Sequence, residues 1–141
     1  MNLHKLRKKL MNQILIFNIS LVALLIIVWM TNGFDFDEFS FTASLLAPLI
    51  AVYMGVFFQF LSKKITEKEE ENEEEKIIPY SNLIKRIIPI HFGAIFLVIL
   101  MKALPLINIQ MMNTFLVLIE SMFGVGTGII LSALFDVKAD S

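Results

Sequence analysis

The chain has 141 residues, with a hydrophobic fraction of 57%, a charged fraction of 18% and a net charge of −1. Soluble domains contain roughly 45–50% apolar and about 25% charged residues, so this chain has more apolar surface than a water-soluble domain of its size can bury. The small net charge gives no reason to expect nucleic acid as a partner, and the absence of cysteine excludes disulfides, thiol catalysis and thiolate metal sites.

The ionisable residues leave long stretches of the sequence uncharged. No Asp, Glu, Lys, Arg or His occurs in residues 10–34, 39–62 or 103–119. A helix that crosses a bilayer needs about 20 mostly apolar residues. These stretches predict an all-α integral membrane protein, and with a further apolar segment at about residues 87–104 they predict four transmembrane helices that form two antiparallel hairpins. The whole chain, residues 1–141, is expected to be one four-span domain.

The first predicted span covers about residues 13–30. A basic segment, MNLHKLRKKL, precedes it, but the apolar run is longer than that of a signal peptide and WMTNGFD offers no cleavage site, which favours a retained span. The span ends near Trp29 and the turn signal Asn32-Gly33. After the short loop TNGFDFDEFS, the second predicted span covers about residues 41–62 and contains Pro48.

A glutamate-rich segment, KKITEKEEENEEEK, separates the two expected hairpins at residues 63–76. Its dense like charge predicts a solvated spacer, and a cation sensor or a dock for a basic partner is the alternative. Residues 79–86 place apolar and polar side chains on opposite sides, which predicts a short interfacial helix. The third span is expected at about residues 87–104, with a kink at Pro89, and the fourth at about residues 112–135.

The distribution of cations predicts the orientation in the membrane. Of the 12 Lys and Arg residues, eleven fall on the side that holds both termini and the glutamate-rich segment, and the other side has Lys102 alone. The positive-inside rule therefore places the N- and C-termini in the cytoplasm. The richness in Ile, Asn, Lys and Phe and the lack of a transit segment favour a prokaryotic plasma (inner) membrane.

Lys102 and Glu120 are ionisable residues inside predicted spans, and they are expected to meet. Each lies sixteen residues from an inner-edge marker, Arg86 or Asp136, so at about 1.5 Å per residue both are placed roughly 24 Å from the inner edge. Consecutive antiparallel spans are normally neighbours. One interpretation is a structural ion pair, or a Lys102 that snorkels to the outer interface. The other is that Glu120 binds protons or cations at a pore or an oligomer axis.

The fourth predicted span carries a stripe of polar and small residues. Asn113, Glu120 and Thr127 are seven residues apart, and Gly124 follows Glu120 by four, so they share one face of the helix. Gly124 and Gly128 form a G-x-x-x-G pattern, which favours close helix association in membranes. The stripe predicts a helix contact whose partner is either the third span or another subunit.

His91 is a third polar candidate, about five residues above Arg86 in the third span. Gln59, four residues before Lys63, is expected at a similar depth. Because buried polar groups seek partners, the sequence predicts a hydrogen bond of His91 to Gln59, as a buried polar pair, or to a backbone group. His4 is the only other histidine, which disfavours haem ligation by a histidine pair, and neither a cofactor nor a metal site is expected.

No arrangement typical of catalysis occurs in the sequence, such as an acid pair or a Ser-His-Asp set, so the chain is expected not to be an enzyme. The leading interpretation is a non-enzymatic small membrane subunit or scaffold that associates, with itself or with another membrane subunit, through its fourth helix. The alternative is a small homo-oligomeric ion channel, pore-forming effector or ion-coupled transporter that uses Glu120. The expected surroundings are the lipid bilayer and membrane partners.

Single cysteines test the orientation in this cysteine-free chain. In intact cells, a membrane-impermeant thiol reagent should label Asp37→Cys, because the loop between the first two spans is expected outside the cytoplasm. The same reagent should label Asn72→Cys only after the cells are permeabilised. Labelling of Asn72→Cys from the outside would reverse the orientation.

Overall fold

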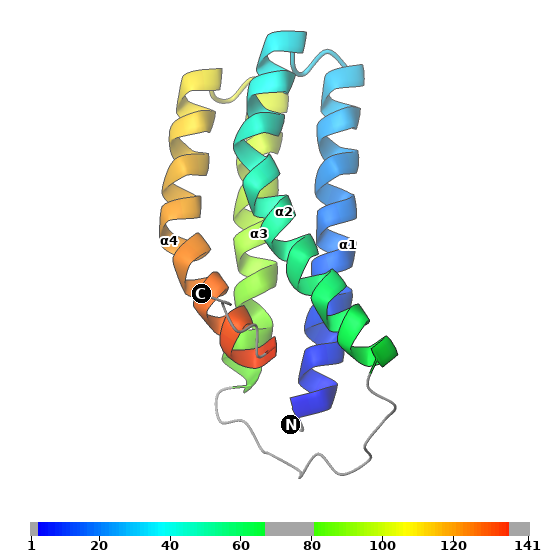
Figure 1. Cartoon of the computed structure of the whole chain (residues 1–141). Helices are drawn as coiled ribbons and strands as arrows, with labels where there is room; N and C mark the ends of the chain where they lie inside the picture. The colour runs from blue at the N-terminus through cyan, green and yellow to red at the C-terminus, as the bar shows by residue number, and fades with distance from the viewer. Residues whose placement is uncertain (1–2, 67–80, 136–141) are drawn as a thin grey trace.

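The computed structural model describes residues 3–66 and 81–135. These residues form four helices, α1 (Leu3–Met30), α2 (Phe36–Thr66), α3 (Ser81–Ala103) and α4 (Ile109–Phe135) (Figure 1). Each helix contains a stretch of 22 to 27 residues that is long and apolar enough to cross a membrane. The all-helical fold therefore supports an integral, multi-pass membrane protein. Most of the glutamate-rich segment lies outside the described residues.

The four helices form a ring of contacts, in which α1 packs against α2 and α3, and α4 packs against α3 and α2. Figure 1 shows the connections 31–35 and 104–108 at one end of the bundle, which is called the loop end. The beginning of α1 and the end of α4 lie at the other end, the terminal end. There Arg7 Nε donates a hydrogen bond to the Leu134 carbonyl at 2.6 Å. This bond satisfies a carbonyl in the last turn of α4 and ties α1 to that turn.

Local sequence explains the tight connection between α1 and α2. Asn32 has a positive φ of 59°, a conformation that asparagine tolerates after a helix. A Cβ at Gly33 would lie 2.7 Å from Val28 Cγ1, so this position requires glycine. A capping box then starts α2, because Asp35 Oδ1 accepts from the Glu38 amide at 2.7 Å and Glu38 Oε2 accepts from the Asp35 amide at 3.2 Å.

The interfacial helix expected at residues 79–86 is not a separate element within the described residues. Residues 81–86 are the first turns of α3, which continues without a break to Ala103. Lys85 Nζ donates to Asn82 Oδ1 at 3.3 Å, a contact between neighbours on one helix face. The polar residues are therefore the terminal-end part of a continuous helix. Pro89, where a kink was expected, lies inside α3.

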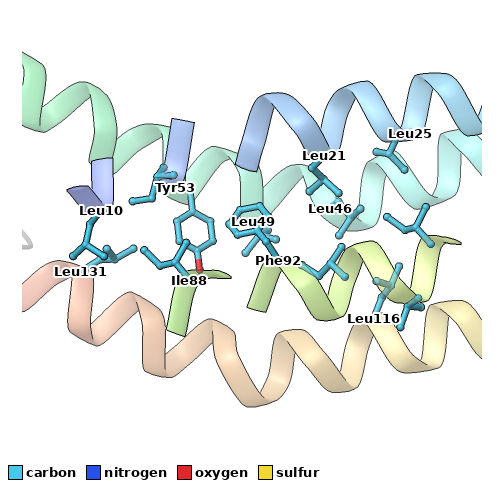
Figure 2. Close-up of a cluster of buried hydrophobic side chains, with 14 of the residues drawn as sticks. Leu10, Leu21, Leu25, Leu46, Leu49, Tyr53, Ile88, Phe92, Leu116 and Leu131 are labelled. Atoms are coloured by element: carbon cyan, nitrogen blue, oxygen red, sulfur yellow. The ribbon is translucent and has the colours of Figure 1, made fainter. Parts of the chain in front are cut away.

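The apolar core extends along the bundle, and all four helices contribute to it (Figure 2). On α4 the core has a gap: Leu116 and Leu131 are buried, but no buried apolar side chain lies between them. The gap contains Glu120 and the buried Thr127. The middle of the bundle is therefore polar where α4 meets its neighbours, and the candidate site lies there.

Candidate functional site

Side chains from three helices form a hydrogen-bonded row inside the bundle. The Tyr53 hydroxyl of α2 lies 3.0 Å from His91 Nδ1 of α3. His91 Nε2 lies 3.1 Å from Glu120 Oε1 of α4. The His91 side chain is 0% exposed and that of Glu120 is 24% exposed. Tyr53, His91 and Glu120 are called the polar triad.

Aromatic rings enclose the imidazole of the triad. Phe123 of α4 stacks on the His91 ring, with ring centroids 5.2 Å apart and an interplanar angle of 15°. Phe92 lies tilted against both His91 and Tyr53. These contacts restrict rotation of the imidazole, so both ring nitrogens stay directed at their partners.

The partners of His91 define where its hydrogen lies. A carboxylate accepts hydrogen bonds and does not donate them, so His91 Nε2 carries the hydrogen and donates to Glu120. In a neutral imidazole the other nitrogen is an acceptor, so the Tyr53 hydroxyl donates to Nδ1. The Tyr53 hydroxyl, which can donate as well as accept, is compatible with this tautomer. Glu120 Oε2 lies outside this network and faces Gly124.

The register between α3 and α4 explains why Glu120 meets His91. Only the five residues 104–108 join the two helices, so the end of α3 and the start of α4 lie at a similar depth in the bundle. Glu120 is eleven residues after the start of α4 at Ile109, and His91 is twelve residues before the end of α3 at Ala103. At about 1.5 Å per residue both lie roughly 16–18 Å from the loop end.

The structure does not bring Lys102 and Glu120 together, which corrects the ion pair expected from the sequence. Lys102 lies one residue from the end of α3 and is therefore about ten residues, or roughly 15 Å, shallower than Glu120. Its Nζ donates to Glu38 Oε2 at 3.1 Å and to the Gly33 carbonyl at 3.4 Å. It also lies 5.8 Å from the centroid of the Phe34 ring. Lys102 thus ties the end of α3 to the start of α2.

The expected pair between His91 and Gln59 is also corrected. Gln59 is exposed, and Tyr53 takes the position beside His91. Residues six apart on a helix point about 240° apart around its axis, so the two side chains cannot both face α3. A signal for Tyr53 exists in the sequence, because it is the one of the two tyrosines that lies in an uncharged stretch.

The two polar ends of the α4 stripe have different surroundings. Thr127 is buried, and its hydroxyl donates to the Phe123 carbonyl at 2.6 Å. Asn113 is half-buried, and its Oδ1 is buried without a hydrogen-bond partner in the described residues. The stripe therefore extends the polar triad along α4 in both directions.

The two glycines of the stripe make no close helix contact within the described part of the chain. A Cβ at Gly124 would meet Glu120 Oε2 at 3.7 Å, which is ordinary van der Waals contact. A Cβ at Gly128 would meet nothing within 4 Å. The third span is therefore not the partner that the G-x-x-x-G pattern requires.

Comparisons with protein-family models, with curated proteins and with solved structures find no match.

A double-mutant cycle tests the partner of Lys102. The free energy of unfolding in detergent is measured for Lys102→Met, Glu38→Gln and the double variant. Because the two side chains are in contact, the coupling energy should be about 1 kcal/mol and should favour the original pair. The matched control is the cycle of Lys102→Met with Glu120→Gln, whose effects should add within about 0.5 kcal/mol. A larger coupling in the control cycle would contradict the structure.

Proposed function

We propose that this protein is a non-enzymatic integral membrane protein whose Glu120 binds a proton inside the bilayer. The observation that carries the proposal is the bond of Glu120 to the buried imidazole of His91, with no cationic side chain against it in the described residues. The hydrocarbon core of a bilayer is about 30 Å thick. At roughly 16–18 Å from the loop end, the carboxyl group lies near its middle. Ionisable groups at such depth mark ion and proton paths.

The proposed topology is two antiparallel hairpins, α1–α2 and α3–α4, with the termini in the cytoplasm of a prokaryotic cell. The support is the charge asymmetry between the ends of the bundle. At the loop end, Lys102 is paired with Glu38. In the described helices, the cations of the terminal end are Lys5, Arg7, Lys8, Lys9, Lys63, Lys64, Lys85 and Arg86. The positive-inside rule then places the loop end outside the cytoplasm.

A proton suits Glu120 better than a calcium ion does. Calcium requires six to eight oxygen ligands, whereas a proton requires one lone pair. Oε1 accepts the hydrogen bond from His91, and Oε2 faces Gly124, so Oε2 is the available position. A proton on Oε2 leaves the hydrogen bonds among Tyr53, His91 and Oε1 in place. It also removes a negative charge from the bilayer interior, where charge is costly.

A hydrophobic carbodiimide tests whether Glu120 becomes protonated. In this reaction the carboxylic acid gives its proton to a carbodiimide nitrogen and its oxygen bonds to the central carbon, so the protonated form reacts. The purified full chain in detergent should be modified at Glu120, at a rate that rises as the pH is lowered. The rate is measured by mass spectrometry of the peptide that contains Glu120.

The control variant for this test is Glu38→Gln, which removes the carboxyl group paired with Lys102 at the loop end. It should leave the modification of Glu120 unchanged, whereas Glu120→Gln should abolish modification of that peptide. If Glu120 does not react at any pH while carboxyl groups of the loops do, Glu120 is not a proton-binding group and the proposal fails.

A second role is self-association through α4, and the surroundings of Gly128 favour it. A Cβ at this position would meet nothing within 4 Å in the described residues, yet Gly128 completes the G-x-x-x-G pattern with Gly124. Small residues on an open helix face let a second helix approach closely in a membrane. The partner proposed is a second copy of this chain.

Substitution of Gly128 separates contact within the chain from contact between copies. Gly128→Ile should leave thermal stability in detergent unchanged, because a Cβ added at this position meets nothing within 4 Å in the described residues. It should reduce the number of copies per nanodisc if copies meet along α4. The matched control is Gly93→Ile, a glycine of α3 that is equally open and outside the pattern. Equal copy numbers for the original chain and Gly128→Ile would show that this face meets lipid.

A further inference from the structure

We propose that protons reach Glu120 from the loop end, along a groove between α2 and α4, and that an apolar layer closes the route from the terminal end. This inference rests on the proposed function of Glu120 and adds to it the side of the membrane that controls the site. With the proposed topology, the controlling side is the one outside the cytoplasm.

The groove lies on the loop-end side of the triad and has a volume of about 320 Å³. Val117, which lines it, is three residues before Glu120, and residues three apart are neighbours on a helix surface. The Glu120 side chain is itself 24% exposed. The groove therefore extends to within one helical turn of the carboxyl group. It is lined by Phe41 and Leu45 of α2 and by Asn113, Thr114, Val117 and Leu118 of α4.

Asn113 gives the groove a polar position. Its Oδ1 is buried and has no hydrogen-bond partner in the described residues, so an unsatisfied acceptor belongs to a residue that lines the groove. Ordered waters occur where buried polar groups lack partners. Asn113 lies seven residues before Glu120 on the same face of α4, so this polar side chain lies between the loop end and the carboxyl group.

The route from the terminal end is narrow and apolar. The crevice there has a volume of about 10 Å³, which is at the lower limit for one water molecule. Thr127 is its one polar residue, and the Thr127 hydroxyl already donates to the Phe123 carbonyl. Figure 2 shows Leu10, Ile88 and Leu131 gathered beside Tyr53 on this side, and all three are buried. The crevice is lined by Leu10, Ile84, Ile87, Ile88, Thr127, Ile130 and Leu131.

Few other ionisable groups face the carboxyl group of Glu120. Of the helices packed against α4, α3 contributes His91 and α2 contributes Tyr53, both members of the triad. The helix α1 has no ionisable side chain from residue 10 to its end. The protonation of Glu120 therefore follows the pH of the compartment to which the groove opens.

Sealed membrane vesicles that contain the full chain test this sidedness. Impermeant buffers set the pH on each side independently, and the rate of carbodiimide modification of Glu120 is measured. Lowering the pH by one unit on the side of the loop end should raise the rate by up to about tenfold, the change in protonated fraction per pH unit. Lowering the pH on the side of the terminal end should leave the rate unchanged. In right-side-out vesicles the rate should follow the pH of the bulk solution, and in inside-out vesicles it should follow the pH of the lumen.

Variants at the two routes sharpen the test. Leu131→Ala thins the apolar layer and should make the rate respond to the pH on both sides; Ile88→Val is the milder variant if Leu131→Ala does not fold. Asn113→Leu keeps the size of the side chain but removes the acceptor. In this variant the rate of Glu120 modification should respond more slowly to a change in pH on the side of the loop end. Its control is Ser121→Ala, which removes a hydroxyl from an exposed position of α4.

Two failures are distinguishable. If the rate in vesicles follows the pH on the side of the terminal end, or the pH on both sides equally, the proposed sidedness is wrong. In that case pH-dependent modification in detergent still supports Glu120 as the proton-binding group. Absence of modification in detergent overturns the proposed function and this inference together.

Discussion

A carboxyl group in the middle of an apolar helix bundle has to find hydrogen-bond partners, because an unpaired charge inside a bilayer is costly. Glu120 finds its partner in His91, and the other ring nitrogen of His91 contacts the Tyr53 hydroxyl. The triad joins α2, α3 and α4 at the level where α4 lacks buried apolar side chains, between Leu116 and Leu131. The polar contact therefore adds to the packing of the partly buried Ile119 and Phe123 at this level.

The loop end sets the register that makes this contact possible. The turn after α1 requires Gly33, the capping box starts α2, and Glu38 of that box also accepts from Lys102 at the end of α3. The start of α2 and the end of α3 are thereby fixed at one depth, and the five residues 104–108 fix the start of α4 beside them. Local turn chemistry at the loop end thus determines which side chains face each other roughly 16–18 Å below.

The uncharged stretches of the sequence predicted four helices with membrane-spanning length, but not the partners of the polar residues. The expected ion pair used Arg86 and Asp136 as markers of equal depth, whereas α3 begins at Ser81 and α4 continues to Phe135. Counting from the short connection instead places Glu120 opposite His91. The choice of Tyr53 over Gln59 depended on which face of α2 meets α3, and that is decided by packing between helices that are distant in sequence.

Nitrogen-15 chemical shifts of His91 in lipid bilayers test the central claim, the bond from His91 to Glu120, most directly. The chain has two histidines, so a His4→Gln variant leaves His91 as the one imidazole observed. We expect a protonated Nε2 and an unprotonated Nδ1 at a pH where Glu120 is a carboxylate. Glu120→Gln should shift the Nε2 resonance and Tyr53→Phe the Nδ1 resonance. A hydrogen on Nδ1, or a Nε2 resonance unaffected by Glu120→Gln, would contradict the account.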